Sequence, residues 1–380
     1  MIRGAGLQSC GRRPCRPVRT RIWLISLREE RILEDPRRTG VLPHAACAIL
    51  QVVRDTDTTG VAPLVSVVIP AYRAAQSIAA TLDSVEAQTF TDYEIVVVND
   101  GSPDTAELAR ALEPYRDRIV YLCQENQGPG GARNTGILAA RGKYVALLDA
   151  DDAWLPDHLA AQLAVLETDP SIDVVYADAR IIGTVPEAGR TVMELCPSAG
   201  EVTFERLVTR QCTVHICVSV CRRETLLRAG LFDSAFRGTE DIDMWLRIAL
   251  QGGRIAYQRR VLGCYRRHAG NLSANRVSML EGFLAVLAKT ARDPHLTTAQ
   301  RQVLERQRAA ERITLELEQG RNAFLAGDTD AALGHLMRVN AQHKSLKLAT
   351  VMMLLRFSPA FLRVIYRWRD RHVYKLKTQS

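Results

Sequence analysis

The 380-residue sequence predicts an α/β fold, a mostly parallel sheet flanked by helices, followed by an α-helical C-terminal region. Two observations predict the sheet. Short apolar runs alternate with helical patterns after residue 62, as expected for parallel strands joined by helices. Polar clusters directly follow three of these runs, which is where ligands bind in such sheets. From about Arg276 onward the pattern is helical.

The first 62 residues precede this alternation. They contain eleven Arg and scattered Pro and Gly, and they show no sustained hydrophobic period. We expect residues 1–62 to be a poorly ordered extension. The first strong strand pattern begins at Val65. We therefore place the α/β domain at residues 63–275 and the helical region at residues 276–380.

The α/β segment begins with four strand and helix pairs. Each predicted strand rests on a run of apolar residues, and each predicted helix on apolar residues three or four positions apart. These strands are Val65–Pro70, Glu94–Val98, Arg118–Leu122 and Lys143–Leu148, and the helices are Ser77–Gln88, Asp104–Tyr115, Gly130–Ala140 and His158–Glu167. The later elements are strands at Asp173–Tyr176, Val214–Val220 and 254–266, helices at Arg222–Ala229 and Glu240–Gln251, and a loop-rich segment up to Gly200.

The C-terminal region contains two recognisable segments. Residues 320–343 resemble a helix-turn-helix. One such hairpin cannot bury its own apolar face, so we expect it to pack on neighbouring helices. Residues 346–377 mix long apolar and aromatic side chains with Arg, which fits a helix at a membrane surface that is broken at Ser358-Pro359. A helix that packs back on the body is the alternative.

Charge and cysteine content limit where the protein works. The net charge is +8, and the last 38 residues hold nine Lys and Arg against one acid. A basic tail on a slightly acidic body indicates contact with an anionic surface. The sequence contains no recognised nucleic-acid-binding module, no regular cysteine spacing and no apolar run near the roughly 20 residues of a membrane span. We expect a cytoplasmic protein, peripheral on the inner face of the membrane, without a nucleic-acid partner.

Three carboxylates follow the fourth strand, at Asp149, Asp151 and Asp152. This much charge at the end of a buried strand is costly unless a cation or a polar ligand lies there. Asp149 and Asp151 face the same way on a continuing strand, and Ala150 between them leaves room. Two hard oxygen ligands in this D-x-D motif suit Mg²⁺ or Mn²⁺ that shares a diphosphate. By itself, the motif is equally typical of a loop that caps the next helix.

Five motifs, in order, resemble those of the family 2 glycosyltransferases with the GT-A fold. They are Val65-Ser-Val-Val-Ile-Pro70-Ala71-Tyr72, Val98-Asn-Asp100-Gly-Ser102, Gln127-Gly128-Pro-Gly-Gly131-Ala-Arg133-Asn134-Thr-Gly136, Asp149-Ala150-Asp151-Asp152 and Glu240-Asp241-Ile-Asp-Met-Trp245-Leu-Arg247. The resemblance covers about residues 64–275. It implies an inverting, metal-dependent hexosyltransferase that moves a sugar from a nucleotide-sugar donor, most commonly a UDP-sugar, to a saccharide or lipid-linked acceptor in cell-surface polysaccharide or glycan biosynthesis.

The resemblance implies roles for individual residues. The implied donor-binding residues are Pro70, Ala71 and Tyr72 beside the base, Asp100 at the base or ribose, Gly131 and Arg133 at the phosphate or base side, and Asp149 with Ala150 near the ribose. The Gly-rich helix start there also favours anions. Asp151 is the implied metal ligand, and His268 completes the metal or diphosphate site. A purely structural histidine is the alternative for His268.

Asp241 is the implied general base, which takes the proton of the acceptor hydroxyl as that hydroxyl attacks the anomeric carbon. Glu240 supports this base or contacts the acceptor. An acidic first turn, favoured by the helix dipole, explains both residues when they are taken alone. Trp245 and Arg247 at the family's spacing favour the catalytic interpretation.

Two other classes of protein fit the sequence less well. A nucleotidyltransferase needs a Gly-rich loop with Lys or Arg straight after the first strand, where this chain has Pro70-Ala71-Tyr72-Arg73. A non-catalytic scaffold that uses the helical tail predicts damaged acidic motifs, and these are intact. The transferred sugar is not identified, and we expect its selectivity in loops such as Gly183–Gly200.

Overall fold

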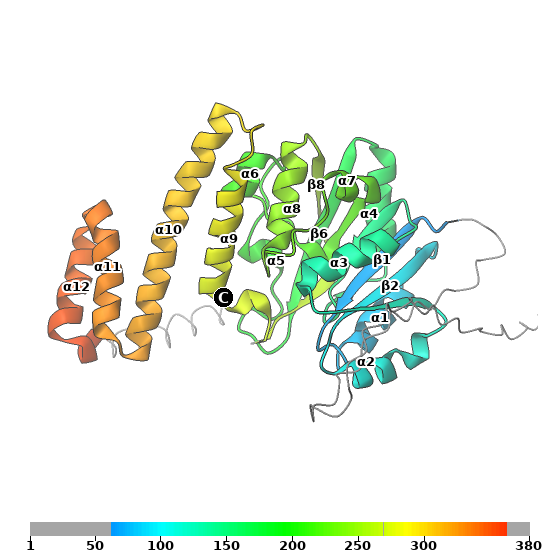
Figure 1. Cartoon of the computed structure of the whole chain (residues 1–380), viewed down its shortest axis with the longest axis horizontal. Coiled ribbons are helices and arrows are strands. Elements are labelled where there is room, and N and C mark those ends of the chain that lie inside the picture. Colours follow the sequence, from blue (N-terminus) through cyan, green and yellow to red (C-terminus); the bar gives the residue numbers. More distant parts are fainter. Residues whose placement is uncertain (1–61, 269, 363–380) are drawn as a thin grey trace, which may run out of the picture. The chain divides into compact units, whose positions relative to one another are not determined.

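The computed structural model describes residues 62–268 and 270–362 (Figure 1). The expected disorder of residues 1–62 falls, except for Ala62, outside the described residues, and so does the tail from residue 363. No helix of the described chain combines the length and the apolar character that crossing a bilayer requires.

A mixed sheet of eight strands forms the α/β part, in the order β3-β2-β1-β4-β7-β6-β8-β5. The strands are β1 (Val65–Ala71), β2 (Tyr93–Asp100), β3 (Ile119–Gln124), β4 (Tyr144–Leu147), β5 (Ala153–Trp154), β6 (Ile172–Ile182), β7 (Ser219–Arg222) and β8 (Arg254–Arg266). Strands β1 to β4 are parallel, whereas β7 runs antiparallel to β4 and β6. The predicted GT-A type of mostly parallel sheet is confirmed.

Helices cover both faces of this sheet (Figure 1). They are α1 (Ile78–Glu86), α2 (Thr105–Leu112), α3 (Gly128–Ala139), α4 (His158–Thr168), α5 (Val192–Leu195), α6 (Phe204–Val208), α7 (Arg223–Arg228) and α8 (Glu240–Leu250). In β1, Val67 and Ile69 pack with α1, α2 and α4, whereas Val68 packs with α3 and α8. Burial on both faces explains why the sequence of β1 is an uninterrupted apolar run.

A close approach of α3 to β1 positions the site. A Cβ atom added at Gly136 would lie 2.4 Å from Val68 Cγ1, so α3 packs on the strand as closely as a glycine permits. This packing brings the Gly-rich start of α3 to the edge where β1, β2 and β4 end.

The predicted strand Val214–Val220 is largely wrong. A 3₁₀ turn, η2 (Ile216–Val218), occupies its middle, and β7 starts only at Ser219. The Ser219 hydroxyl donates to the carbonyl of Ile216 (2.7 Å) and closes this turn. The run is apolar because it is buried, and an apolar run of this length does not reveal its backbone conformation.

Four further elements differ from the prediction. Strand β6 extends to Ile182, well beyond the predicted end at Tyr176, and β5 was not predicted. The segment expected to be rich in loops contains the short helix α5, and the unpredicted short helix α6 follows it. Each begins at a Thr whose hydroxyl accepts a backbone N–H bond, at Thr191 and Thr203, and such caps are a local signal of a helix start.

The helical C-terminal region is confirmed. It consists of α9 (Arg276–Thr290), α10 (Thr298–Ala326), α11 (Thr329–His343) and α12 (Leu346–Phe357), which ends at the predicted break. The predicted hairpin is formed by the end of α10 and by α11. Its apolar face packs on α12 through Phe324, Ala332 and Leu355, as expected for a hairpin that cannot bury its own face.

Candidate active site

The first two motifs meet at the carboxyl edge of β1 and β2. Pro70 and Ala71 end β1, and the following Tyr72 is 47% exposed. Arg73 has a left-handed backbone (φ 53°), and its N–H donates to the Ser102 hydroxyl (2.6 Å). This bond ties the end of β1 to the motif after β2. It leaves the Tyr72 ring at the surface, where a base can stack on it.

Asp100 is buried at the end of β2. Its Oδ1 accepts hydrogen bonds from Gln124 Nε2 (2.7 Å) and from the backbone N–H of Gln127 (2.8 Å), and its carbonyl accepts from Asn126 Nδ2 (2.9 Å). Asp100 therefore organises the turn that leads into α3. Its contact with a base or ribose stays a prediction.

Arg133 joins the third, fourth and fifth motifs. Its side chain is 4% exposed, and it donates from Nη1 to Glu240 Oε1 (2.6 Å) and from Nη2 to Asp149 Oδ1 (2.5 Å). Burial by itself lowers the pKa of Arg133, but the charges of Asp149 and Glu240 raise that pKa above its ordinary value. The guanidinium is therefore a permanent positive charge between the two carboxylates.

The Gly-rich start of α3 allows this arrangement. A Cβ atom added at Gly130 would lie 3.3 Å from Glu240 Cγ, and one added at Gly131 would lie 2.4 Å from Gln127 Cβ. The second oxygen of Glu240 accepts from the backbone N–H of Gly238 (2.6 Å). The acidic start of α8 is thus packed against α3, and the predicted role of Gly131 toward the donor stays a prediction.

Asp241 follows Glu240 in the first turn of α8 and is half-buried. Its Oδ1 accepts from the backbone N–H of Ile242 (2.8 Å). Burial and the charge of Glu240 raise the pKa of Asp241 to about 7, although Arg133 opposes this rise. A carboxylate with a pKa near the working pH is suited to take up a proton.

Trp245 and Arg247, which favoured a catalytic interpretation of this helix, have structural contacts. Arg247 donates from Nε to Asp243 (2.9 Å) and from Nη2 to the carbonyl of Leu231 (2.7 Å). Trp245 is buried in the core between α8 and the sheet. Arg247 ties the loop before α8 to this helix, and Trp245 packs the helix into the core.

Asp151 provides the candidate metal position. Its Oδ2 lies 3.4 Å from His268 Nε2 and 3.3 Å from Asn271 Nδ2, and the side chains of Asp149 and Asp151 are each 31% exposed. Burial and the charge of Asp149 raise the pKa of Asp151, a cost that a bound cation would remove. The predicted pair of Asp151 and His268 is therefore brought together.

The donor set fits a metal that shares its ligands with a substrate. Within residues 62–268 and 270–362, no group of three or more His, Cys, Asp and Glu side chains is arranged to hold a metal ion. Mg²⁺ and similar ions need no such group when one or two protein ligands, water and phosphate oxygens complete the coordination. Asp151 and His268 meet this requirement.

Asp152 differs from the two other carboxylates of its motif. It is 1% exposed, its Oδ1 accepts from the backbone N–H of Arg266 (2.7 Å), and its carbonyl accepts from the Thr81 hydroxyl (2.8 Å). Burial, followed by the charges of Asp149 and Asp151, raises its pKa well above the ordinary value. Asp152 therefore anchors the turn after β4 to β8 and to α1.

Sequence reasoning missed several residues of this site. His215 Nδ1 lies 3.0 Å from Cys217 Sγ, and the His215 ring meets Tyr265 edge-on, with centroids 4.6 Å apart. Asn271 approaches Asp151 from the turn after β8. A single histidine inside an apolar run carries no sequence signal. The spacing of Asn271, three residues after His268, could have drawn attention to it.

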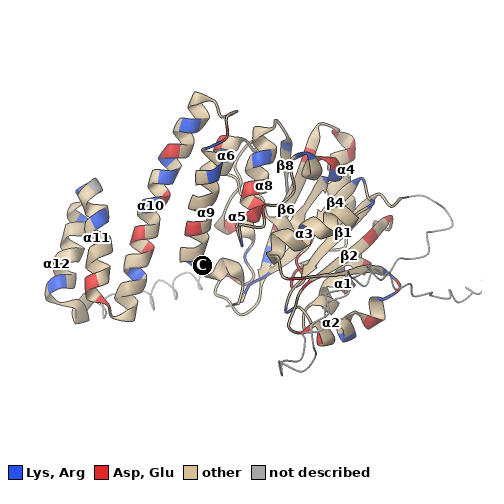
Figure 2. Cartoon of the chain, viewed as in Figure 1, with Lys and Arg blue, Asp and Glu red and all other residues tan. Residues whose placement is uncertain are grey.

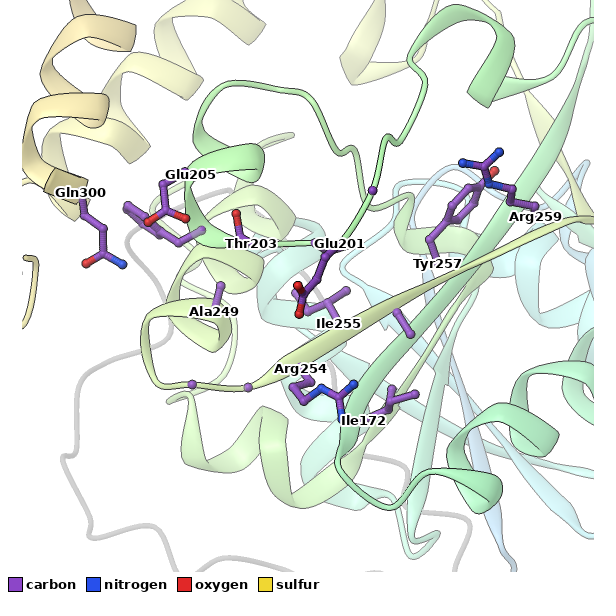
Figure 3. A pocket seen from close by; sticks show the side chains of 16 residues that line it. Ile172, Glu201, Thr203, Glu205, Ala249, Arg254, Ile255, Tyr257, Arg259 and Gln300 are labelled. Atoms are coloured by element: carbon purple, nitrogen blue, oxygen red, sulfur yellow. The ribbon is translucent and has the colours of Figure 1, made fainter.

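A pocket of about 500 Å³ lies apart from these residues (Figure 3). Glu201 and Ile255 lie next to each other in its lining, and Gln300 reaches it from α10. Its Arg254 already pairs with Asp169 (3.2 Å). None of the predicted site residues lines this pocket, so we assign it no part in the candidate active site.

Comparison with known proteins gives a consistent result. The family model "Glycosyl transferase family 2" matches residues 66–223. The Escherichia coli protein named UDP-Glc:alpha-D-GlcNAc-diphosphoundecaprenol beta-1,3-glucosyltransferase WfgD is 30% identical over 234 residues, which cover 61% of this chain and 88% of the relative. The succinoglycan biosynthesis protein ExoO of Rhizobium meliloti is 31% identical over 288 residues, which cover 71% of this chain and 81% of the relative.

A solved structure supports the same fold. The mannosyltransferase PcManGT of Pyrobaculum calidifontis, in complex with GDP-Man and Mn²⁺, aligns with a TM-score of 0.54 at 22% identity. The alignment covers 83% of this chain and 86% of that structure.

Proposed function

The chain belongs to glycosyl transferase family 2, and we propose that it transfers a sugar, with inversion, from a UDP-sugar to a hydroxyl of a lipid-linked saccharide in polysaccharide biosynthesis. One observation carries the proposal. Arg133 bridges Asp149 and Glu240, and this bridge holds the D-x-D turn and the start of α8 in one site. The proposed base, Asp241, lies beside that bridge.

In this proposal, Asp241 accepts the proton of the acceptor hydroxyl. The hydroxyl oxygen forms a bond to the anomeric carbon, and the bond from that carbon to the diphosphate oxygen breaks on the opposite face. The UDP leaves with the bonding electron pair, so the anomeric configuration inverts. The pKa of Asp241 is raised to about 7, so Asp241 is a stronger base than an ordinary carboxylate. At pH 7 about half of the Asp241 side chains are still ionised and able to accept a proton.

Asp151 and His268 would hold a divalent ion, and Mg²⁺ or Mn²⁺ is our proposal for it. The related fold of PcManGT was solved with Mn²⁺, which supports divalent metal use. When bound, such an ion stabilises the negative charge that develops on the leaving diphosphate.

The donor would lie along the edge where β1, β2 and β4 end. Tyr72 offers an exposed ring for the base, and Asp149 and Asp151, each 31% exposed, would face the diphosphate and ribose. The name of WfgD specifies UDP-Glc, which supports a UDP-sugar here. The proposed donor-binding residues are Pro70, Ala71, Tyr72, Asp100, Gly131, Arg133, Asp149 and Ala150.

The donor assignment can be tested by binding. We would measure the affinity of the full chain for a panel of UDP-, GDP- and TDP-sugars, with Mn²⁺, with Mg²⁺ and with a chelator. We expect metal-dependent binding of a UDP-sugar that is lost in Asp151→Asn. The control Asp157→Asn changes a carboxylate that is 61% exposed at the start of α4 and should bind as the wild type does. A folded wild type that binds no nucleotide sugar would contradict the proposal.

We also propose that α12 rests on an anionic lipid surface, which would bring the enzyme to a lipid-linked acceptor. Leu346, Met353 and Phe357 lie on one face of α12 and are 86%, 56% and 79% exposed, whereas Leu355 on the opposite face is 1% exposed. A helix that is apolar all round is typically covered on both sides. Residues 331–362 include four Lys and Arg and no acid, so the charge favours anionic head groups (Figure 2).

Vesicle sedimentation tests this surface. We expect the full chain to bind vesicles that contain phosphatidylglycerol and to bind phosphatidylcholine vesicles weakly. The triple variant Leu346→Ser, Met353→Ser and Phe357→Ser should lose this binding. Leu138→Ser, which changes a 60% exposed leucine on α3, should keep it. Equal binding to both vesicles would refute the proposal. If the wild type is a dimer and the triple variant is a monomer, a second copy of the chain is instead the partner of this face.

A further inference from the structure

His215 lies at the edge of the sheet that carries Asp149 and Asp151, although none of the five motifs contains it. Strands β4 and β7 are antiparallel, with Leu147 opposite Ser219. The chain that continues forward from β4 leads to Asp149, and the chain that leads into β7 passes through His215 and Cys217. The two segments therefore run side by side. The charge of Asp149 acts on His215, but burial dominates and lowers the pKa of His215 to about 4. The imidazole is neutral at physiological pH.

Two contacts fix the orientation of the ring. Nδ1 lies 3.0 Å from Cys217 Sγ, and the ring meets Tyr265 at an angle of 70°. The Tyr265 hydroxyl is in turn 2.9 Å from the Ser273 hydroxyl. Burial, followed by the charge of Asp152, raises the pKa of Cys217 well above its ordinary value, so the thiol stays protonated. The His215 ring and the Cys217 thiol are therefore both neutral, and their contacts hold them in place.

The second ring nitrogen is left for a ligand. Nε2 makes no hydrogen bond to any residue that the structure describes, and the side chain is only half-buried. A neutral imidazole nitrogen forms one hydrogen bond, as a donor or an acceptor according to its tautomer. That chemistry matches a sugar hydroxyl, whereas a diphosphate favours cations.

The place of His215 also indicates which part of the donor it meets. The proposed diphosphate side is Asp151 with His268, and the proposed base is Asp241. The transferred sugar must lie between them, along the bridge from Asp149 to Glu240. His215 lies near enough to this path for the charge of Asp149 to act on it.

We infer that His215 determines sugar specificity by hydrogen-bonding, through Nε2, a hydroxyl of the transferred sugar. The inference rests on the proposed donor site. It assigns a function to a histidine that lies outside the five motifs, and it makes Cys217 and Tyr265 the residues that position the ring.

The test compares the nucleotide with the nucleotide sugar. His215→Phe keeps a ring that can face Tyr265 but removes the hydrogen bond, and His215→Gln keeps an amide near the same place. The matched control is His295→Phe, because His295 is exposed in the turn before α10. For each variant we would measure the dissociation constant of UDP, and kcat/KM for the preferred UDP-sugar and for its 4-epimer.

We expect His215→Phe to lower kcat/KM for the preferred sugar about 10- to 100-fold, to reduce discrimination between the epimers, and to change UDP affinity less than about twofold. His215→Gln should recover part of the discrimination. Equal losses for UDP and UDP-sugar, or unchanged discrimination, would overturn the inference alone. A wild type that binds no nucleotide sugar would overturn it together with the donor assignment.

Discussion

Replacement of Arg133 by methionine tests the bridge that organises the site. The guanidinium is 4% exposed and bonds Glu240 at 2.6 Å and Asp149 at 2.5 Å. Methionine has an unbranched side chain of shorter reach and no charge. Arg133→Met therefore leaves Glu240, whose side chain is 5% exposed, as a buried carboxylate without its cation. Asp149 loses the same partner but is 31% exposed and stays partly hydrated.

Removal of one partner from a buried ion pair costs about 3–5 kcal/mol of stability, because the remaining charge has lost its water and its counter-charge. Most of this cost should arise at Glu240. The control is Arg116→Met, which breaks a pair whose side chains are 66% and 67% exposed. An exposed pair of this kind contributes about 0–1 kcal/mol. The two Arg→Met substitutions thus differ mainly in burial.

Urea unfolding of the full chain, followed by circular dichroism, measures both losses. We expect a much larger loss for Arg133→Met than for Arg116→Met, and partial recovery in the double variant Arg133→Met with Glu240→Gln, which removes the orphaned charge. If Arg133→Met does not fold, Arg133→Lys provides the test, because a lysine cannot bond both carboxylates in the same way. A loss below about 1 kcal/mol for either variant would refute the interpretation of Arg133 as the central support.

Three further predictions concern the base, its titration and the packing of α3. Asp241→Asn should lower the rate of transfer about 10²- to 10⁴-fold in a UDP-release assay and leave UDP binding unchanged. The pKa of Asp241, raised to about 7, should make wild-type kcat/KM rise with pH up to about 7 and then level off. Because a raised carboxyl pKa makes ionisation oppose folding, Asp241→Asn should also be more stable than the wild type at pH 8 but not at pH 4; a flat pH–rate profile would contradict this base. Gly136→Ala places a Cβ 2.4 Å from Val68 Cγ1 and should cost about 1–3 kcal/mol in urea unfolding. The control is Gly334→Ala, which also lies in a helix and whose added Cβ meets only the flexible Arg338 side chain, at 3.7 Å; it should show no such cost.

The sheet and the edge that carries the site could be predicted from local sequence. Strands such as β1 and β4 are buried on both faces, so they appear as uninterrupted apolar runs. The rule that ligands bind at the carboxyl ends of parallel strands then places the polar residues that follow these runs at one edge. The failure at Val214–Val220 has the same origin, because burial rather than strand pairing makes that segment apolar.

The partners of the side chains could not be predicted in this way. Arg133 and Glu240 are 107 positions apart, and no local pattern records that an arginine in one helix neutralises a glutamate in another. The His215 ring likewise meets Tyr265, which lies 50 positions later in the chain, on β8.

The three carboxylates after β4 illustrate why both kinds of information are needed. Alternation along an extended chain predicts that Asp149 and Asp151 share a side, and both are 31% exposed whereas Asp152 is 1% exposed. Alternation alone assigns Asp149 and Asp151 the same chemistry. Only the tertiary structure separates them. Arg133 forms an ion pair with the Asp149 carboxylate, whereas His268 and Asn271 lie at the Asp151 carboxylate and Arg266 bonds only the Asp151 backbone carbonyl. Among the described residues, no Lys or Arg forms an ion pair with the Asp151 carboxylate, and so Asp151 is the one whose charge a bound metal ion would balance.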